Sequence, residues 1–513
     1  MFRRPAIAGI VLGVAALCAQ TDVNGGTRRP YGGVLKVPVT DSIDTVDPAY
    51  VSTPAELEMA RQIHDTLYRL TKDGVLQPVL AQDLPQVSRG GRELIIRLKP
   101  KAVFHDGSGV TSSDVLASWR RLLHPDSKSA HWWLLAPIEG ALAFHQGKST
   151  RISGLEKINR LTFRIRLLAP MPGFARVLTT VPTAPLPMKW LAKKDRGAFP
   201  PGSGPFVWSA STRTGEEMAL KAFLGHCRGR PFLDRVALLP FPSPRAAGLA
   251  FELEEVHLSR VRPSRRTGFY HNVEGPRVHM VFLALNPQRI EKLPSGFKKA
   301  VEQAVDRQAL VDYLVGNQGV ATDEIVVHRS PEGPPEPLRG DPRSAREYFK
   351  RVMLEKKGVP PVLEFLVPEG RALDKSVAER IQVNLVDIGV VVSVVQVDRK
   401  TFEARREAGE YDFYLARPLV LTTDAELQLL GLVATVLGET EAEDLLRSLD
   451  KLPAVAGSNR AAMIREMARR YQVRFSWIPL FQFARQMFLH DSVQGVVPDA
   501  TGQTDFAQVW LIR

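Results

Sequence analysis

One segment, residues 362–397, constrains the fold more than any other because it carries the pattern of a strand, a helix and a second strand. The runs 362–367 and 390–397 are short and mostly apolar, which is typical of buried strands. Between them, apolar residues recur at helical spacing over 375–388. Two parallel strands joined by a helix need a right-handed crossover and a sheet covered on both faces. This part therefore predicts a doubly wound α/β lobe.

Further elements of both kinds are predicted along the chain. Apolar spacing and turn residues predict strands at 34–39, 94–98, 161–167 and 278–285, and helices at 56–70 and 114–123. Thr111, Ser112 and Ser113 offer N-caps for the second of these helices. A chain of 513 residues is too long for one compact core. We therefore expect two or three mixed α/β domains.

The N-terminus predicts export. Arg3 and Arg4 precede the apolar run 5–17, which is about the length of a signal-peptide core and too short to span a bilayer. Lipidation of Cys18 would need a small residue where Leu17 stands, so a soluble mature chain is favoured over a lipid-anchored one. The expected location is the periplasm. Two cysteines, Cys18 and Cys227, give no disulfide framework.

The net charge of +13 admits nucleic acid, a membrane surface or an acidic ligand as partner. Nucleic acid is disfavoured because the basic residues are scattered and lack interleaved aromatics. The eleven histidines are dispersed without the i,i+4 spacing of helical metal ligands. We expect neither a metal nor a nucleic acid.

No catalytic or cofactor motif is present in the sequence. There is no Gly-x-Ser-x-Gly elbow, no His-Glu-x-x-His, no phosphate loop and no Cys-x-x-Cys. The Gly202-Ser203-Gly204-Pro205 loop lacks the third glycine of a dinucleotide fingerprint, and Pro205 lacks an amide donor. It predicts a tight structural turn, and the chain is expected to have no cofactor and no catalytic activity.

A family resemblance emerges from the order of several motifs. The run FHDGSGVTSSDVLASW, residues 104–119, resembles the phrase by which family 5 extracellular solute-binding proteins are recognised. Other matches follow in the expected order: Asp47-Pro48, Leu67-Tyr68, 78–81, 202–206, 297–311, 388–390, Tyr411-Asp412 and 478–480. Together they cover nearly the whole mature chain.

The resemblance implies a two-lobed α/β periplasmic-binding-protein fold of class II type with an extra α/β subdomain. The expected divisions are a signal peptide and spacer at 1–25, a discontinuous first lobe, its subdomain and a second lobe. The first lobe would comprise 30–50, 155–275 and 476–513, the subdomain 51–154, and the second lobe 276–475. The first crossing between lobes is expected at Gly275-Pro276, and paired crossings would permit hinge closure.

The resemblance also implies a function. The chain would be a monomeric receptor, peripheral to the membrane, that captures a peptide or other small solute between its lobes. It would deliver that solute to an ABC permease and ATPase complex. A lobe-clamp sensor or scaffold that has lost the transport role remains an alternative, and an enzyme is a third possibility without a nucleophile to nominate.

Candidate ligand contacts follow from the same resemblance. In the family the loop after the first strand lines the cleft, which nominates Asp41, Ser42 and Asp44, although a solvated acidic turn would have the same composition. Trp132 and Trp133 stand where the family often offers an aromatic ring to its ligand. Simple packing of both rings is the alternative.

The chain departs from the family after Tyr411-Asp412. Peptide-binding relatives place an aromatic and a carboxylate there to hold the ligand's ammonium, whereas this sequence has Pro418 and Leu421. Tyr414 and Arg417 stand nearby, and Arg417 would suit an acidic ligand. Asp424 could replace the carboxylate, but Thr423-Asp424-Ala425-Glu426 also predicts a helix-capping box.

Overall fold

The computed structural model describes residues 29–512 except 195, 212–216, 265–267, 294–295, 328–339, 357–361 and 453–456. The predicted signal peptide, including Cys18, lies outside these residues. Within the described ranges, none of the helices combines the length and apolar character needed to cross a lipid bilayer.

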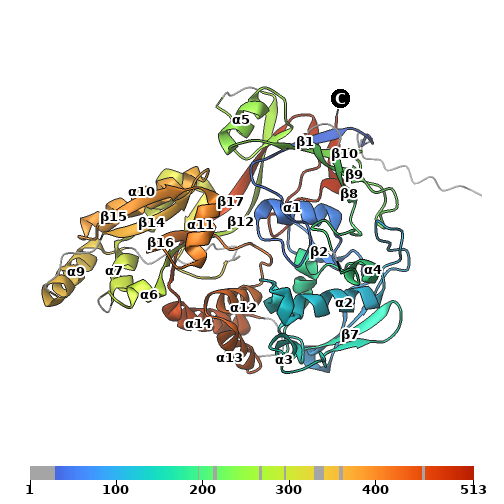
Figure 1. The fold of residues 1–513 in the computed structure, drawn as a ribbon, viewed down its shortest axis with the longest axis horizontal. Coiled ribbons are helices and arrows are strands. Elements are labelled where there is room, and N and C mark those ends of the chain that lie inside the picture. The colour runs from blue at the N-terminus through green and yellow to red at the C-terminus, as the bar shows by residue number, and fades with distance from the viewer. Residues whose placement is uncertain are drawn as a thin grey trace, which may run out of the picture.

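The predicted first strand is confirmed and belongs to a four-stranded sheet. β1 (Val34–Val39) pairs in parallel with β10 (Arg235–Pro240). The sheet continues through β9 (Glu217–Ala222) to β8 (Phe206–Ser211). In Figure 1 this sheet lies at the upper right, above helix α1 (Pro54–Ile63).

A second four-stranded sheet packs with helix α2 (Ser112–Leu123). Its order is β4 (Gln86–Ser88), β5 (Glu93–Arg97), β7 (Thr162–Arg166) and β6 (Leu155–Lys157). Thr111 caps α2 with its side chain, and the Asp114 carboxylate accepts the Thr111 N–H at 2.9 Å. Trp119 of α2 lies edge-on to Phe163 of β7, with 5.6 Å between the ring centroids. The strands and helix predicted here are confirmed.

The predicted helix 56–70 is wrong in its second half. α1 ends at Ile63, His64 is extended, and the chain enters β2 (Tyr68–Leu70), which pairs with β3 (Leu76–Pro78). The Gly204 N–H donates to the Ile63 carbonyl at 2.8 Å. A Cβ on Gly202 would overlap the same carbonyl oxygen. The Gly202–Pro205 loop is therefore a tight structural turn, as predicted, and α1 ends where this turn docks.

The largest sheet has seven strands. Six follow the order β11 (Leu258–Ser259), β17 (Trp477–His490), β12 (Tyr270–Leu285), β16 (Phe413–Ala416), β14 (Leu363–Pro368) and β15 (Val392–Val397), and β13 (Gly319–Ala321) pairs with β17. β14, α10 (Ala372–Asp387) and β15 form the predicted βαβ unit, with the two strands parallel. This unit lies at the left of Figure 1.

β12 begins at Tyr270, well before the predicted start at 278. The segment 270–277 has little strand pattern, but it pairs with the C-terminal half of β17. The register shifts between Glu274 and Arg277, so Gly275-Pro276 sits at an irregularity inside a continuous strand. Long-range pairing with β17, rather than local side-chain pattern, thus sets the start of this strand.

Three C-terminal helices pack beside α2 rather than beside the βαβ unit (Figure 1). They are α12 (Ala425–Val436), α13 (Glu439–Leu449) and α14 (Ser458–Arg474). Leu427, Leu445 and Ile464 bury their side chains in the core that contains Trp119. A separate core contains Val377, Ile381 and Leu385 of α10. The predicted domain boundaries stay a prediction, but these helices share their core with the predicted subdomain.

Candidate functional site

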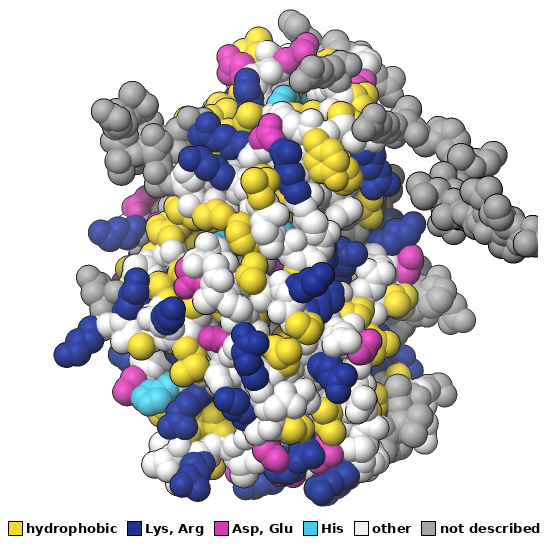
Figure 2. Space-filling model, turned by 90° about the vertical axis from the view of Figure 1, so that its right-hand side faces the viewer, with side chains coloured by type: hydrophobic (Ala, Val, Ile, Leu, Met, Phe, Trp, Pro, Cys, Tyr) yellow, Lys and Arg dark blue, Asp and Glu magenta, His cyan; other side chains and the backbone are white. Residues whose placement is uncertain are grey.

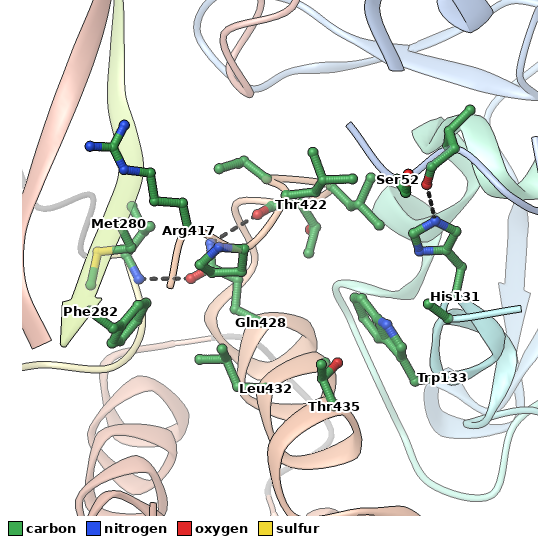
Figure 3. A pocket seen from close by; sticks show the side chains of 18 of the residues that line it. Ser52, His131, Trp133, Met280, Phe282, Arg417, Thr422, Gln428, Leu432 and Thr435 are labelled. Carbon is green, nitrogen blue, oxygen red and sulfur yellow. Dashed lines mark hydrogen bonds between the residues drawn. The ribbon is translucent and has the colours of Figure 1, made fainter. Parts of the chain in front are cut away.

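A cavity of about 480 Å³ lies between two walls that come from distant parts of the chain (Figure 3). The first wall is formed by residues 49–52 and by residues of the segment 128–133. The second wall is formed by β12, residues 417–422 and α12, together with Trp477 of β17. A solute in this cavity would therefore touch both walls at once.

Trp133 supplies the aromatic surface of the first wall. It lies in a short 3-10 helix, Trp132–Leu135, and its ring points into the cavity (Figure 3). A Cβ on Gly431 would lie 2.8 Å from this ring, so α12 approaches so closely because residue 431 is glycine. Trp477 also lines the cavity, and within the described residues the indole N–H groups of Trp133 and Trp477 donate no hydrogen bond.

The second wall is mostly apolar. Val278, Met280 and Phe282 line the cavity from β12, at the alternate positions that share one face of a strand. The residues between them face elsewhere, and Val281 and Leu283 belong to the other core. Leu432 of α12 also lines the cavity, so β12 and α12 offer a solute hydrocarbon surface.

Gln428 holds the second wall together. Its Oε1 accepts the Val327 N–H at 2.7 Å, and its Nε2 donates to the Thr422 carbonyl at 2.9 Å. Both ends of the amide are therefore occupied by backbone groups. Gln428 fixes the segment 417–422 beside α12 and is a positioning residue.

His131 offers an acceptor on the first wall. Its Nε2 lies 2.6 Å from the Val51 carbonyl oxygen, which can only accept, so Nε2 carries the proton. Burial lowers the pKa of His131, and the Val51 hydrogen bond opposes that shift. The ring is therefore neutral near pH 7, and its Nδ1 remains as an acceptor on the cavity side (Figure 3).

The charged residues of the described lining are all basic: Lys128, Arg406 and Arg417. Glu56, whose carboxylate contacts the first wall at Ser52, is committed to backbone donors. It accepts the N–H of Ser52 at 2.8 Å and that of Thr53 at 3.1 Å. A ligand ammonium would consequently meet no carboxylate in the described lining.

Arg417 reaches the cavity, but its charge is already paired. Its guanidinium forms an ion pair with the buried Asp374 near the start of α10, and it lies 5.8 Å from the Phe483 ring centroid. Figure 3 shows this group turned away from Gln428. Burial lowers the pKa of Arg417, and Asp374 opposes that shift.

Most of the other predicted contact residues lie off the cavity lining. Asp41 pairs with Arg399 at 3.0 Å, and the Ser42 hydroxyl donates to Asp44 at 3.2 Å. Among the predicted residues, Trp133 and Arg417 are the two that the structure brings to the cavity. The loop after β1, which carries Asp41, Ser42 and Asp44, instead connects the side of the molecule with the first wall to the side with the second wall, through Arg399.

Trp132 and Tyr414 pack away from the cavity. Trp132 stacks on His145 with 4.5 Å between ring centroids. Tyr414 is buried in β16 and lies edge-on to Tyr411 at 4.9 Å. For both, packing is the role that the contacts show.

Asp424 is the N-cap of α12, and its Oδ1 accepts the Leu427 N–H at 3.3 Å. The predicted capping box, which began at Thr423, is therefore wrong by one residue. Glu426 does not take part in the cap, because its carboxylate pairs with Arg460 at 2.5 Å. Asp424 also lies 3.6 Å from Arg176.

No pattern in the sequence indicated the β12 wall. Val278, Met280 and Phe282 stand in a run that is buried on both faces, so no polar alternation marked the face toward the cavity. Gln428 resembled any surface residue of a helix. Its role depends on Val327 and Thr422, which only the fold brings to it.

A group of potential metal ligands lies elsewhere. His226 Nε2 is 2.8 Å from Asp65, and Cys227 lies beside the same carboxylate. Arg228 also pairs with Asp65 at 3.5 Å and supplies a positive charge where a cation would sit. Burial raises the pKa of the Cys227 thiol to about 11, so the thiol is protonated near pH 7.

Comparison with known proteins gives one family match and several distant relatives. The model of the bacterial extracellular solute-binding proteins, family 5 Middle, matches residues 75–434. The nickel-binding periplasmic protein of Escherichia coli is 21% identical over 422 residues, covering 75% of this chain and 76% of that protein. The periplasmic murein peptide-binding protein MppA of E. coli is 22% identical over 314 residues, 59% of this chain and 58% of that protein.

The fold is shared with solved structures of low sequence identity. The pheromone receptor PrgZ aligns with a TM-score of 0.80 at 20% identity, covering 94% of this chain and 99% of that one. The E. coli murein tripeptide-binding protein MppA also aligns at 0.80, with 19% identity over 95% and 100% of the chains. The unliganded open form of MppA aligns at 0.62 with 18% identity, covering 95% and 99%.

Proposed function

Because the chain belongs to the bacterial extracellular solute-binding proteins of family 5, we propose that it is a receptor that delivers a small solute to an ABC importer. Proteins of this family bind solutes and do not catalyse reactions. The observation that carries the proposal is the two-walled cavity. A solute that touches both walls is enclosed when the walls approach one another. Export to the periplasm is part of the proposal, since its named relatives are periplasmic.

The lining favours an apolar solute without a cationic group. Val278, Met280 and Phe282 present hydrocarbon and aromatic surface, and Trp133 and Trp477 add indole rings. A buried ammonium without a carboxylate carries a large desolvation cost. A zwitterionic peptide therefore fits this cavity less well than an apolar neutral or acidic molecule.

The names of the relatives indicate different ligands and do not identify the ligand of this chain. They include a nickel-binding protein, a murein peptide-binding protein and a probable deoxycholate-binding protein, all from E. coli. The last is 23% identical over 337 residues, 63% of this chain and 62% of that protein. Ligand class therefore has to be argued from the lining of this cavity.

Closure follows from ligand contacts on both walls. A solute held by Trp133 and by β12 binds more tightly when the walls are near, so binding shifts the population toward the closed form. The importer would then meet a closed, loaded receptor.

The proposal is tested by a thermal-shift screen of the purified mature protein followed by an uptake assay. Apolar acids and neutral apolar solutes should raise the melting temperature, whereas dipeptides and tripeptides should not. Leu432→Trp, which fills the cavity, should abolish the shift. Stabilisation by peptides alone would contradict the ligand class.

The uptake assay tests the importer role. Cells that lack the protein should lose uptake of the solute found in the screen, and the wild-type gene should restore it. Unchanged uptake together with tight binding would contradict delivery to an importer and favour a sensor.

A further inference from the structure

Within the described ranges, Arg485 of β17 is an arginine without a counter-ion. Its side chain makes no hydrogen bond and no ion pair there, and the residue is partly buried. Most buried arginines here are paired, as Arg460 is with Glu426. Partial removal of a cation from water without a partner is unfavourable, so the environment of Arg485 favours an anion.

The carboxylates near Arg485 are engaged elsewhere. Asp41 and Glu58 are its acidic neighbours. Asp41 pairs with Arg399 at 3.0 Å, and Glu58 pairs with Arg260 at 2.5 Å. Burial and the nearby Arg260 lower the pKa of Arg485 to about 10, which leaves it charged near neutral pH. Positive charge therefore exceeds negative charge at this place.

His279 of β12 is a second unpartnered donor. The residue is 8% exposed, and its buried Nε2 has no hydrogen-bond partner among the residues that the structure describes. Burial, with Arg485 and Arg260 nearby, lowers the pKa of His279 to about 2. A neutral imidazole still carries one N–H, which can donate to an oxyanion.

The ring of Phe483 brings these groups together. His279 lies 5.6 Å and the Arg417 guanidinium 5.8 Å from its ring centroid. Arg485 follows two residues later on the same strand, on the same face. Arg485, His279 and Arg417 thus form one basic cluster around Phe483.

This basic cluster lies between the two sides of the molecule. Asp41 and Glu58 flank the first wall in sequence, whereas Arg417 and its partner Asp374 lie just beyond the carboxyl ends of β16 and β14. Ligands of open α/β sheets bind outside the carboxyl ends of strands. Arg417 also lines the cavity, whereas its guanidinium and His279 lie against Phe483, and His279 is on the face of β12 opposite to Val278 and Met280.

We propose that Arg485, with the N–H of His279, binds an oxyanion between the two sides, beside the Arg417–Asp374 ion pair. The anion is either a free inorganic ion or the acidic group of the solute itself. The inference depends on the proposed function only in the second case, since a free anion could join the two sides whatever the solute is.

The test is thermal unfolding and calorimetric titration with inorganic phosphate. Phosphate should raise the melting temperature of the wild-type protein saturably, and Arg485→Gln should lose at least tenfold in phosphate affinity. Without phosphate, Arg485→Gln should be at least as stable as the wild type, because a partly buried charge with no counter-ion among the described residues has been removed. Arg470→Gln, on the surface of α14, should respond as the wild type does.

Two further variants distinguish a loss of phosphate binding from a folding defect. Arg485→Lys keeps the charge and should retain part of the phosphate response. His279→Leu should weaken phosphate binding at least threefold. No saturable response in the wild type, or an equal response in Arg485→Gln, would overturn the inference.

The relative affinities of decanoate and decanol, and their competition with phosphate, distinguish the two sources of the anion. If the solute supplies the anion, decanoate binds at least tenfold more tightly than decanol, loses this advantage in Arg485→Gln, and competes with phosphate. If the anion is free, phosphate and the apolar probes bind together without competition. The phosphate response alone tests the cluster, so its failure would leave the proposed receptor function standing.

Discussion

The carboxylate of Asp41 lies 3.0 Å from the guanidinium of Arg399, and this pair joins the loop after β1 to the start of α11 (Arg399–Glu407). The two residues are 358 positions apart in the sequence. Their contact connects the side that carries the first wall to the side that carries the second. It therefore exists only while the two sides are near one another.

Asp41→Asn should weaken ligand binding modestly. Both side chains are substantially exposed, 39% for Arg399 and 49% for Asp41, and such pairs contribute about 0.2–1 kcal/mol. The dissociation constant measured by calorimetry should rise by no more than about fivefold, and the effect should shrink at high salt. The double variant Asp41→Arg/Arg399→Asp should restore affinity. Failure of this swap to restore affinity would contradict a closure role for the pair.

The two adjacent tryptophans give a matched test of the cavity. Trp132 and Trp133 are almost equally buried, at 9% and 8% exposed, but only Trp133 lines the cavity. Each change to Ala should cost about 3–5 kcal/mol of stability. Trp133→Ala should also weaken solute binding by about tenfold or more, whereas Trp132→Ala should not. Equal losses of affinity, measured well below both melting temperatures, would show that the cavity is not the binding site.

The buried pair of Glu426 and Arg460 should hold α12 to α14. Their side chains are nearly inaccessible and 2.5 Å apart. Glu426→Ala leaves a buried guanidinium without its carboxylate, which should lower the free energy of unfolding by about 3–5 kcal/mol. The control is Glu466→Ala, which removes an exposed pair with Arg470 on the same helix and should cost under about 1 kcal/mol. Similar decreases in the free energy of unfolding, measured by urea titration of the two variants, would contradict this assignment.

Acid should destabilise the protein through its buried neutral histidines. Burial, followed by the nearby His105, lowers the pKa of His64 from 6.5 to about 3. At pH values between about 3 and 6.5, His64 binds a proton in the unfolded chain but not in the folded chain. The stability contributed by neutral His64 is therefore complete above pH 6.5 and is lost as the pH falls toward 3, by about 1.4 kcal/mol per pH unit.

His64→Gln should accordingly flatten the dependence of unfolding free energy on pH below 6.5 by about one proton. The wild-type protein is the reference for this slope. Urea titrations at several pH values between 7 and 4 measure both slopes. An unaltered slope in His64→Gln would show that His64 does not stay neutral in the folded state.

The sequence predicted the elements whose signals are local. The βαβ unit followed from two apolar runs and a helical stripe, and α2 followed from Thr111 and the apolar spacing after it. The end of α1 could not be predicted, because it depends on the Gly204 N–H that docks on Ile63. The early start of β12 likewise depends on β17, far along the chain.

The candidate site was less predictable than the fold for the same reason. The family resemblance indicated Trp133, which reaches the cavity, but it also indicated Asp41, which pairs with Arg399 instead. The sequence could not show that Asp374 neutralises Arg417. Ion pairs between distant residues decide which charges remain for a ligand.

The central claim is that two walls close on a solute, and a distance measured across the cleft tests it most directly. Spin labels would replace Ser42 and Lys400, which are exposed on opposite sides of the Asp41–Arg399 contact, in a chain carrying Cys227→Ser. Without solute, double electron–electron resonance should show a broad distribution of label-to-label distances that extends to long values. Saturating solute should narrow it to one short distance. The same distribution with and without bound solute would contradict the account.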